Sequence, residues 1–300
     1  MEKLNNPINK TYPTKILDVI ETNSLINSYS KLLGIDISSS FREVQNIFLL
    51  ECQVTGYQFF YPFTIAGDDK FYENLQVFNW YYCENKWEFN VARQFITNGS
   101  LLEIGCGNGD FLKSLKSIKN LQLQGFELNQ EAIKKCQSKG LNVSAGNLEQ
   151  FLGLEFDYIV NFQVLEHLSD INSFFDNCYK ILSTDSKLII GVPNTDSFVF
   201  KPYKKEKYLQ HPSLLLNMPP HHMGWWNAKT LEKVANEFGF ICEHVIYEKM
   251  SFERIELVVN NLKSYYFFKF ISNRLLKVFF QKFYLYFKGE TMVMILRKKK

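Results

Sequence analysis

The 300-residue sequence is 46% hydrophobic and carries 34 basic against 31 acidic side chains, a net charge of +3. This composition is sufficient for one large domain with an appended piece, and the charge is too small to indicate a nucleic-acid partner. The opening residues, MEKLNNPINK, have no export signal, and no apolar run reaches the roughly 20 residues that span a membrane. We therefore expect a cytoplasmic protein whose six cysteines are free thiols, since none forms a C-x-x-C pair.

Residues 1–85 show little periodicity. They contain Pro7, Pro13, Pro62 and an aromatic stretch, YQFFYPF, at 57–63. Because proline interrupts helices and strands alike, we predict a mostly irregular and helical N-terminal extension over 1–85. The main domain is predicted over 86–300.

Strands and helices alternate along the main domain. Trp87, Val91 and Phe95 have helical spacing, and short apolar runs predict strands at 100–104, 121–127, 141–144, 156–162, 187–192 and 240–247. Helices long enough to cross a sheet indicate parallel strands. The predicted fold is therefore α/β, with a Rossmann-like, doubly wound, mostly parallel sheet whose ligands bind beyond the carboxyl ends of the strands.

Polar and glycine residues follow the first four predicted strands. The first strand ends in EIGCGNGD at 103–110, where alternate glycines permit a tight turn and a close ligand approach. Glu127 ends the second strand, about 20 residues on, where a carboxylate binds the ribose hydroxyls in dinucleotide folds. Asn147 follows the third strand, and NFQVLEH follows the fourth at 161–167. Together these residues predict a nucleoside site.

At these residues the sequence resembles the class I methyltransferases that depend on S-adenosylmethionine (SAM). The matching stretches are LLEIGCGNGDFL, GFELN, GNLEQF, FDYIVNFQVLEHL and, more loosely, ILSTDSKLIIGVPN, within about 86–245. A later segment, PPHH at 219–222, is similar to one in a bacterial subgroup that acts on small molecules, sugars among them.

The resemblance implies SAM as cofactor and a role for each matching position. Glu103 would orient the amino end, the glycine loop would line the methionine part, Glu127 would hold the ribose, and Asn147 stands where the family usually has Asp. The implied cofactor-binding residues are Glu103, Gly105, Cys106, Gly107, Glu127, Leu128, Asn147, Leu148, Phe162 and Gln163.

Charge and spacing favour SAM over a nicotinamide dinucleotide. The glycines follow G-x-G-x-G, whereas dinucleotide sites use G-x-G-x-x-G. Glu103 directly before the loop would oppose a phosphate but suits a ligand with ammonium and sulfonium groups.

Histidines are the candidate general bases for the acceptor. His222 and then His221 are preferred, because they lie in a long loop, 193–226, after the fifth strand, and loops of this length are typically functional or disordered. His167 is a third candidate, and a bracing role remains open for each of the three. We expect no metal, since two adjacent histidines do not complete a zinc site.

Two segments depart from the family pattern. Residues 51–62, ECQVTGYQFFYP, resemble the end of a zinc module in which Thr55 replaces a cysteine, which suggests a remnant without metal, or chance similarity. Residues 251–288 predict a helical insertion with many aromatics and a basic stripe through Lys263, Arg274, Lys277, Gln281 and Lys288. A helix packed on the domain or on a second copy in a homodimer is preferred to a membrane-surface helix over 262–288. A last strand is predicted at 290–296.

The favoured function is methyl transfer from SAM to a small-molecule acceptor, with a sugar or nucleotide-linked sugar indicated by the PPHH segment. A lipid or quinone acceptor, a NAD-dependent oxidoreductase and a non-catalytic SAM-binding subunit remain as alternatives.

Overall fold

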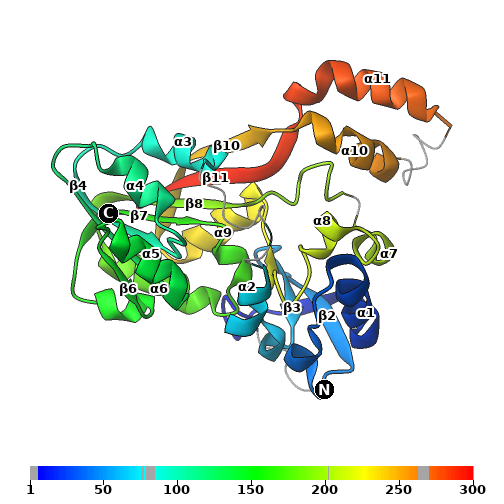
Figure 1. Ribbon diagram of the computed structural model, residues 1–300, viewed down its shortest axis with the longest axis horizontal. Coiled ribbons are helices and arrows are strands. Elements are labelled where there is room, and N and C mark those ends of the chain that lie inside the picture. Colours follow the sequence, from blue (N-terminus) through cyan, green and yellow to red (C-terminus); the bar gives the residue numbers. More distant parts are fainter. Residues whose placement is uncertain (1–5, 76–77, 79–84, 202, 263–269, 300) are drawn as a thin grey trace.

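The computed structural model describes residues 6–75, 78, 85–201, 203–262 and 270–299. Its strands form two sheets, one of seven strands in the order β10-β11-β8-β7-β4-β5-β6 and one of four in the order β1-β2-β3-β9 (Figure 1). The larger sheet belongs to the predicted main domain, and most of the smaller sheet belongs to the N-terminal extension.

The seven-stranded sheet has the predicted doubly wound topology. Its parallel strands are β4 (Gly99–Ile104), β5 (Leu121–Glu127), β6 (Val143–Ala145), β7 (Phe156–Phe162) and β8 (Leu182–Pro193). The last strand, β11 (Lys288–Lys298), runs antiparallel between β8 and the edge strand β10 (Phe240–Lys249). The prediction of a Rossmann-like α/β fold is confirmed.

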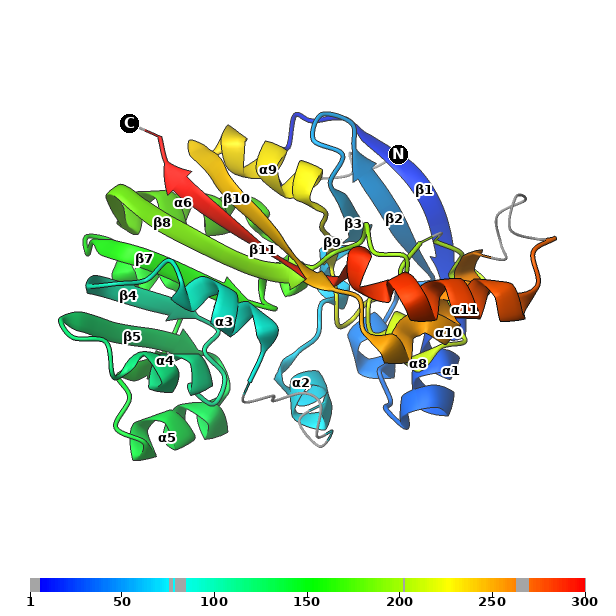
Figure 2. The same ribbon diagram turned by 90° about the horizontal axis from the view of Figure 1, so that it is seen from above.

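Helices cover both faces of this sheet (Figure 2). On one face lie α3 (Trp87–Arg93), α4 (Asp110–Leu115) and α5 (Gln130–Ser138), and on the other lie α6 (Ile171–Ile181) and α9 (Ala228–Glu237). Three of these helices have capped N-termini: the side chains of Asn129, Asp170 and Asn227 each accept a hydrogen bond from a backbone N–H in the first turn of α5, α6 and α9. Fully buried side chains such as Leu102 and Ile159 fill the layers between sheet and helices.

Strand β4 lies at the topological switch point of the sheet. It pairs with β5 on one side and with β7 on the other, so the chain reverses its direction of travel across the sheet there. Ligands of open α/β sheets bind beyond the carboxyl ends of the strands at this point. The residues that follow β4, β5 and β7 therefore share one edge.

The N-terminal extension contains three strands of a small sheet, which the prediction of a mostly irregular and helical segment did not include. It contains β1 (Thr14–Glu21), α1 (Thr22–Leu33), β2 (Asn46–Cys52), β3 (Gln58–Tyr61) and α2 (Asp69–Leu75). The prolines mark strand ends: Pro13 directly precedes β1 and Pro62 directly follows β3. Proline at these positions interrupts no ladder hydrogen bond, which explains why it does not exclude strands here.

The small sheet joins the extension to the main domain. Its last strand, β9 (Gly224–Trp225), comes from the long loop after β8 and pairs with β3. Trp226 is buried and stacks on Tyr57 with ring centroids 4.0 Å apart. The predicted boundary after residue 85 therefore does not separate two structural units completely, because the small sheet takes β1, β2 and β3 from before it and β9 from after it.

The segment that resembles a zinc module forms the turn between β2 and β3. The N–H of Thr55 lies 3.5 Å from Cys52 Sγ, and the N–H of Gly56 donates to the carbonyl of Cys52. The described cysteines are free thiols: Cys52, Cys106, Cys136, Cys178 and Cys242. A metal-free remnant stays a prediction.

The C-terminal insertion forms two described helices, α10 (Ile255–Leu262) and α11 (Asn273–Phe283). The predicted stripe does not lie on one helix, because Lys288 begins β11, while Lys263 lies outside the described residues. Leu276 and Phe280 of α11 are buried in the core beside the small sheet. Opposite them the side chains of Leu275, Val278 and Phe279 are 64%, 56% and 49% exposed. Within the described part of the chain, no helix combines the length and apolar character needed to cross a membrane.

Candidate cofactor and acceptor site

A cavity of about 990 Å³ opens beyond the carboxyl ends of β4, β5 and β7. All thirteen residues that the sequence predicts for the cofactor and for catalysis line it, which brings together segments more than 100 positions apart. This shared location does not assign a role to any one of them. The roles follow from the local geometry of each part of the cavity.

The glycine loop after β4 has the backbone shape that only glycine adopts readily. Gly105 and Gly107 have φ of +66° and +52°, in the left-handed region. A Cβ at Gly105 would also lie 2.6 Å from a methyl carbon of Val164. The N–H groups of Gly105 and Cys106 both donate to the carbonyl of Phe126, which ties the loop to β5. The loop is thus a fixed bend with little side-chain bulk towards the cavity.

Glu127 is held against this bend. One carboxylate oxygen accepts a hydrogen bond from Gly107 N at 2.8 Å, and the other accepts from Leu128 N at 2.8 Å and Asn129 N at 3.0 Å. Three backbone donors fix the position and orientation of the carboxyl group. The carboxyl group of Glu127 therefore lies between the glycine loop and the start of α5.

Glu103 is a buried acid with unused hydrogen-bonding capacity. Its side chain is 3% exposed, and its Oε2 has no partner among the described residues. Burial raises its pKa well above the ordinary carboxyl range. A cationic ligand group would compensate for this burial, because it pairs with the charged form.

The charge of the cavity also favours a cation. Its described lining includes a single lysine, Lys86, against nine carboxyl side chains, which are Glu73, Glu88, Glu103, Asp110, Glu127, Glu131, Glu149, Glu166 and Asp170. Such a surface repels phosphates and attracts a ligand with ammonium or sulfonium groups.

At the end of the cavity near β6, two predicted residues differ in burial. Leu148 is 8% exposed and Leu128 is 67% exposed. A flat apolar group could therefore lie between the buried side chain of Leu148 and the exposed side chain of Leu128. The amide of Asn147 donates to Glu149 Oε2 at 3.4 Å, and its oxygen remains able to accept from a ligand.

Phe162 and Gln163 contribute differently. The ring of Phe162 packs in the core against Phe111, with centroids 4.8 Å apart. Gln163 has φ of +57°, a strained value for a residue with a side chain, and its amide donates to Glu88 at 3.3 Å. Sequence reasoning missed Glu88, because helical spacing gives no sign that a polar residue of α3 faces a ligand.

The three candidate histidines lie in contact with one another. Their ring centroids are 4.7 Å apart for His167 and His221, 4.9 Å for His167 and His222, and 4.5 Å for His221 and His222. His167 ends a 3-10 turn, Leu165–His167, directly after β7, and the other two lie in the long loop before β9. The histidines thus form one cluster in the wall of the cavity.

Burial sets the protonation of this cluster. It lowers the pKa of His167 to about 4 and those of His221 and His222 well below the ordinary histidine range. The imidazoles are therefore neutral at pH 7. Burial also raises the pKa of neighbouring Glu166 to about 8.

Sequence reasoning missed two residues beside the histidines. Glu166 is 1% exposed and neither of its oxygens has a partner among the described residues. The ring of Tyr72 on α2 meets His167 edge-on, with centroids 5.7 Å apart. Glu166 had a signal, its place next to His167 after a predicted strand, whereas Tyr72 lies in the extension and had none.

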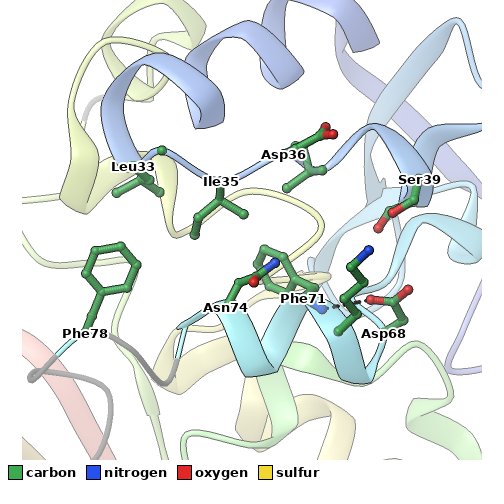
Figure 3. Close-up of a pocket in the computed structure, with 12 residues that line it drawn as sticks. Leu33, Ile35, Asp36, Ser39, Asp68, Phe71, Asn74 and Phe78 are labelled. Carbon is green, nitrogen blue, oxygen red and sulfur yellow. Dashed lines mark hydrogen bonds between the residues drawn. The ribbon is translucent and has the colours of Figure 1, made fainter.

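A second cavity, of about 510 Å³, lies beside α2 (Figure 3). Asp36, Ser39, Asp68 and Asn74 give it a polar wall, and it shares no described lining residue with the larger cavity. Phe71 of α2 lines it, and the same ring lies 6.0 Å from that of His221. The two cavities are thus separated by one helix.

Comparison with known proteins identifies the fold and the family. The model of a family described as "Methyltransferase domain" matches residues 78–245, more than half of the chain. An uncharacterized protein of Methanocaldococcus jannaschii is 30% identical over 124 residues, which cover 41% of this chain and 58% of that protein. A probable S-adenosylmethionine-dependent methyltransferase of Mycobacterium tuberculosis is 24% identical over 182 residues, 59% of this chain and 61% of that protein.

A solved structure has the same fold. The structure of a SAM-dependent methyltransferase from Archaeoglobus fulgidus superimposes with a TM-score of 0.50 at 19% identity, over 77% of this chain and 100% of that one. The chain spans between 53% and 61% of the length of the first curated relatives that it matches.

Proposed function

The chain belongs to the methyltransferase domain family, whose cofactor is SAM, and on this premise we propose that it transfers the methyl group of SAM to a hydroxyl-bearing small molecule. The observation that carries the proposal is the position of Glu127, bonded to the glycine bend at the switch point of the sheet. A carboxylate fixed there is suited to the two hydroxyls of a ribose.

The lining of the cavity fits SAM along its length. Glu127 would bind the ribose, and Asn147 and Leu148 would contact the adenine. The bend at 105–107 would lie along the methionine part, with Glu103 near its ammonium group. SAM supplies a methyl group on a sulfonium, which is a good leaving group, so the protein chiefly needs to align the acceptor.

The histidine cluster would face the acceptor. His222 remains our first choice as general base, followed by His221 and His167, because each lines the cavity as a neutral imidazole with a lone pair. The burial that lowers their pKa values also weakens them as bases. A sugar fits the polar lining, and the PPHH resemblance supports the same class. Because carboxylates repel phosphates, the diphosphate of a nucleotide-linked sugar would have to remain outside the cavity.

An acceptor at a lipid surface is the second candidate, and the exposed face of α11 favours it. Leu275, Val278 and Phe279 are exposed beside the basic residues Arg274 and Lys282, a combination that suits an anionic membrane surface. Co-sedimentation with anionic vesicles, compared with the variant Phe279→Glu, would test this candidate. A homodimer through the same face would instead appear as a doubled mass in light scattering. In either case we propose a cytoplasmic enzyme.

The proposed function is tested by binding and turnover. Calorimetry should show one SAM per chain and no binding of NAD, which separates the methyltransferase from an oxidoreductase. Production of S-adenosylhomocysteine should then depend on the acceptor in a panel of free sugars, nucleotide-linked sugars and quinols. Binding of NAD in place of SAM would overturn the proposal, and SAM binding without turnover on any acceptor would favour a non-catalytic subunit.

A further inference from the structure

We propose that His167, His221 and His222 bind one divalent transition-metal ion of the zinc type at the acceptor end of the cavity. This inference rests on the proposed function and deepens it, since it assigns the acceptor atom as a hydroxyl oxygen bound to the ion. The sequence-based expectation of no metal rested on two adjacent histidines. The fold adds a third histidine from 54 positions earlier in the chain.

The donor atoms are close enough to share an ion. One ring nitrogen from each histidine lies within 4.8 Å of those of the other two. Zinc–nitrogen bonds of 2.0–2.1 Å in a tetrahedral site place the nitrogens about 3.4 Å apart. Closing the cluster therefore requires ring movements of roughly 1 Å, which side-chain rotation about χ1 and χ2 can supply.

Hydrogen bonds prepare two of the rings as ligands. Nδ1 of His167 lies 2.6 Å from the carbonyl oxygen of His221, and Nδ1 of His221 lies 2.9 Å from the carbonyl oxygen of Leu216. A carbonyl only accepts, so each Nδ1 carries the proton and each Nε2 presents its lone pair. Metal-binding histidines are typically oriented by such a bond to a backbone carbonyl.

Other polar atoms of the cluster lack protein partners. Nδ1 of the buried His222 has none among the described residues, and neither has Oε1 or Oε2 of Glu166. Buried polar atoms are nearly always satisfied. Glu166 Oε1 lies 4.0 Å from His167 Nε2, so a divalent cation at the histidines would supply His222 with a bond and the carboxylate with a nearby positive charge.

Three neutral imidazoles leave one position of a tetrahedral ion open. A hydroxyl bound there would have its pKa lowered by the ion. In the transfer, the acceptor oxygen forms a bond to the methyl carbon, and the carbon–sulfur bond breaks with its electron pair remaining on sulfur. The hydroxyl proton is released to the solvent in the cavity, so the charge of the sulfonium is balanced by the released proton, and in this arrangement the histidines act as metal ligands and not as bases.

The metal site is tested on the full chain without reference to activity. Protein dialysed against a chelator and then against buffer is titrated with Co²⁺, whose visible absorption reports an ion bound by three or four nitrogen and oxygen ligands, and with Zn²⁺ by calorimetry. We expect one ion per chain, with at least 100-fold weaker binding in His222→Gln and in His221→Gln. His244→Gln is the matched control, because this histidine lies on the edge strand β10 and is not among the residues that line the cavity. This variant should bind the ion as tightly as the unmodified chain.

The outcomes separate this proposal from the proposed function. Binding of SAM is measured in the same metal-free samples and is expected to change less than threefold when the ion is added. If the unmodified chain binds SAM but takes up no stoichiometric Co²⁺ or Zn²⁺, the metal site is refuted and the methyltransferase proposal stands. Equal metal affinity in the His221, His222 and His244 variants would also refute it. Loss of SAM binding in every sample would instead contradict the proposed function.

Discussion

Replacement of Glu127 by alanine should selectively weaken the binding of SAM. In the structure this carboxylate is fixed by three backbone N–H groups at 2.8–3.0 Å, so it is positioned before a ligand arrives. A hydrogen bond to a charged group contributes about 1.5–3 kcal/mol. If the ribose hydroxyls use two such bonds, Glu127→Ala loses about 3 kcal/mol or more, which is at least roughly 100-fold in Kd by calorimetry.

The control for this variant is Glu131→Ala. Glu131 also lines the cavity, but it lies on the surface of α5, with its side chain 70% exposed and paired with Lys134. Its loss should change the SAM affinity less than twofold, since exposed pairs contribute little. Thermal unfolding of both variants would separate an effect on the ligand from an effect on the loop. A Glu127→Ala variant that binds SAM within threefold of the unmodified chain would refute the reasoning, as would an equal loss in Glu131→Ala.

The remaining predictions concern Glu103, Gly105 and Tyr57. Because burial raises the pKa of Glu103, this group should release its proton when the SAM ammonium binds beside it. The number of protons released per SAM is obtained from binding enthalpies measured in buffers of different ionisation enthalpy. It should reach up to one for the unmodified chain and be zero for Glu103→Gln. Without ligand, the free energy of unfolding should fall as pH rises from the ordinary carboxyl range through the raised pKa of Glu103, since the unfolded chain loses this proton first. Urea unfolding at a series of pH values should show this fall for the unmodified chain, and Glu103→Gln should lack the part that Glu103 causes. Gly105→Ala should lower the free energy of unfolding by about 1–2 kcal/mol, because alanine is strained at the left-handed φ of this position, and it should weaken SAM binding. Adding Val164→Ala removes the 2.6 Å clash but leaves the backbone strain, so the double variant should recover SAM affinity only in part. Tyr57→Ala should lower the free energy of unfolding in urea by about 3 kcal/mol, because it removes the ring stacked on Trp226. If the extension and the main domain unfold together, the variant should still show a single unfolding transition.

The large sheet was predictable because each strand has its own apolar run. Residues 121–127 and 156–162 were predicted as strands and form β5 and β7 with those bounds. The third strand was placed at 141–144, whereas β6 is Val143–Ala145, because Leu141 is buried in the core without joining the ladder. The glycine loop and Glu127 followed from their positions at strand ends, which local sequence reveals.

The small sheet and the histidine cluster were not predictable in this way. Strand β9 has two residues, too few for any periodicity, and it exists because β3 offers it a partner. The contact between His167 and His221 joins positions 54 apart, and it depends on the path of a long loop. Both features are set by tertiary pairing, which composition and spacing do not encode.

The N-terminal extension and the loop that carries His221 and His222 are linked through three backbone hydrogen bonds. Phe60 N donates to the carbonyl of Met223 at 2.9 Å, Met223 N donates to the carbonyl of Glu166 at 2.7 Å, and Gly67 N donates to the carbonyl of Pro220 at 2.9 Å. The PPHH segment is thus bound on one side by the small sheet and on the other by the turn after β7. Since the proposed SAM site is built on β4 and β5 instead, changes in the extension should alter the proposed acceptor side and leave cofactor affinity intact. Under the proposed function, the extension would therefore form part of the acceptor site, because it fixes the histidines that line the cavity.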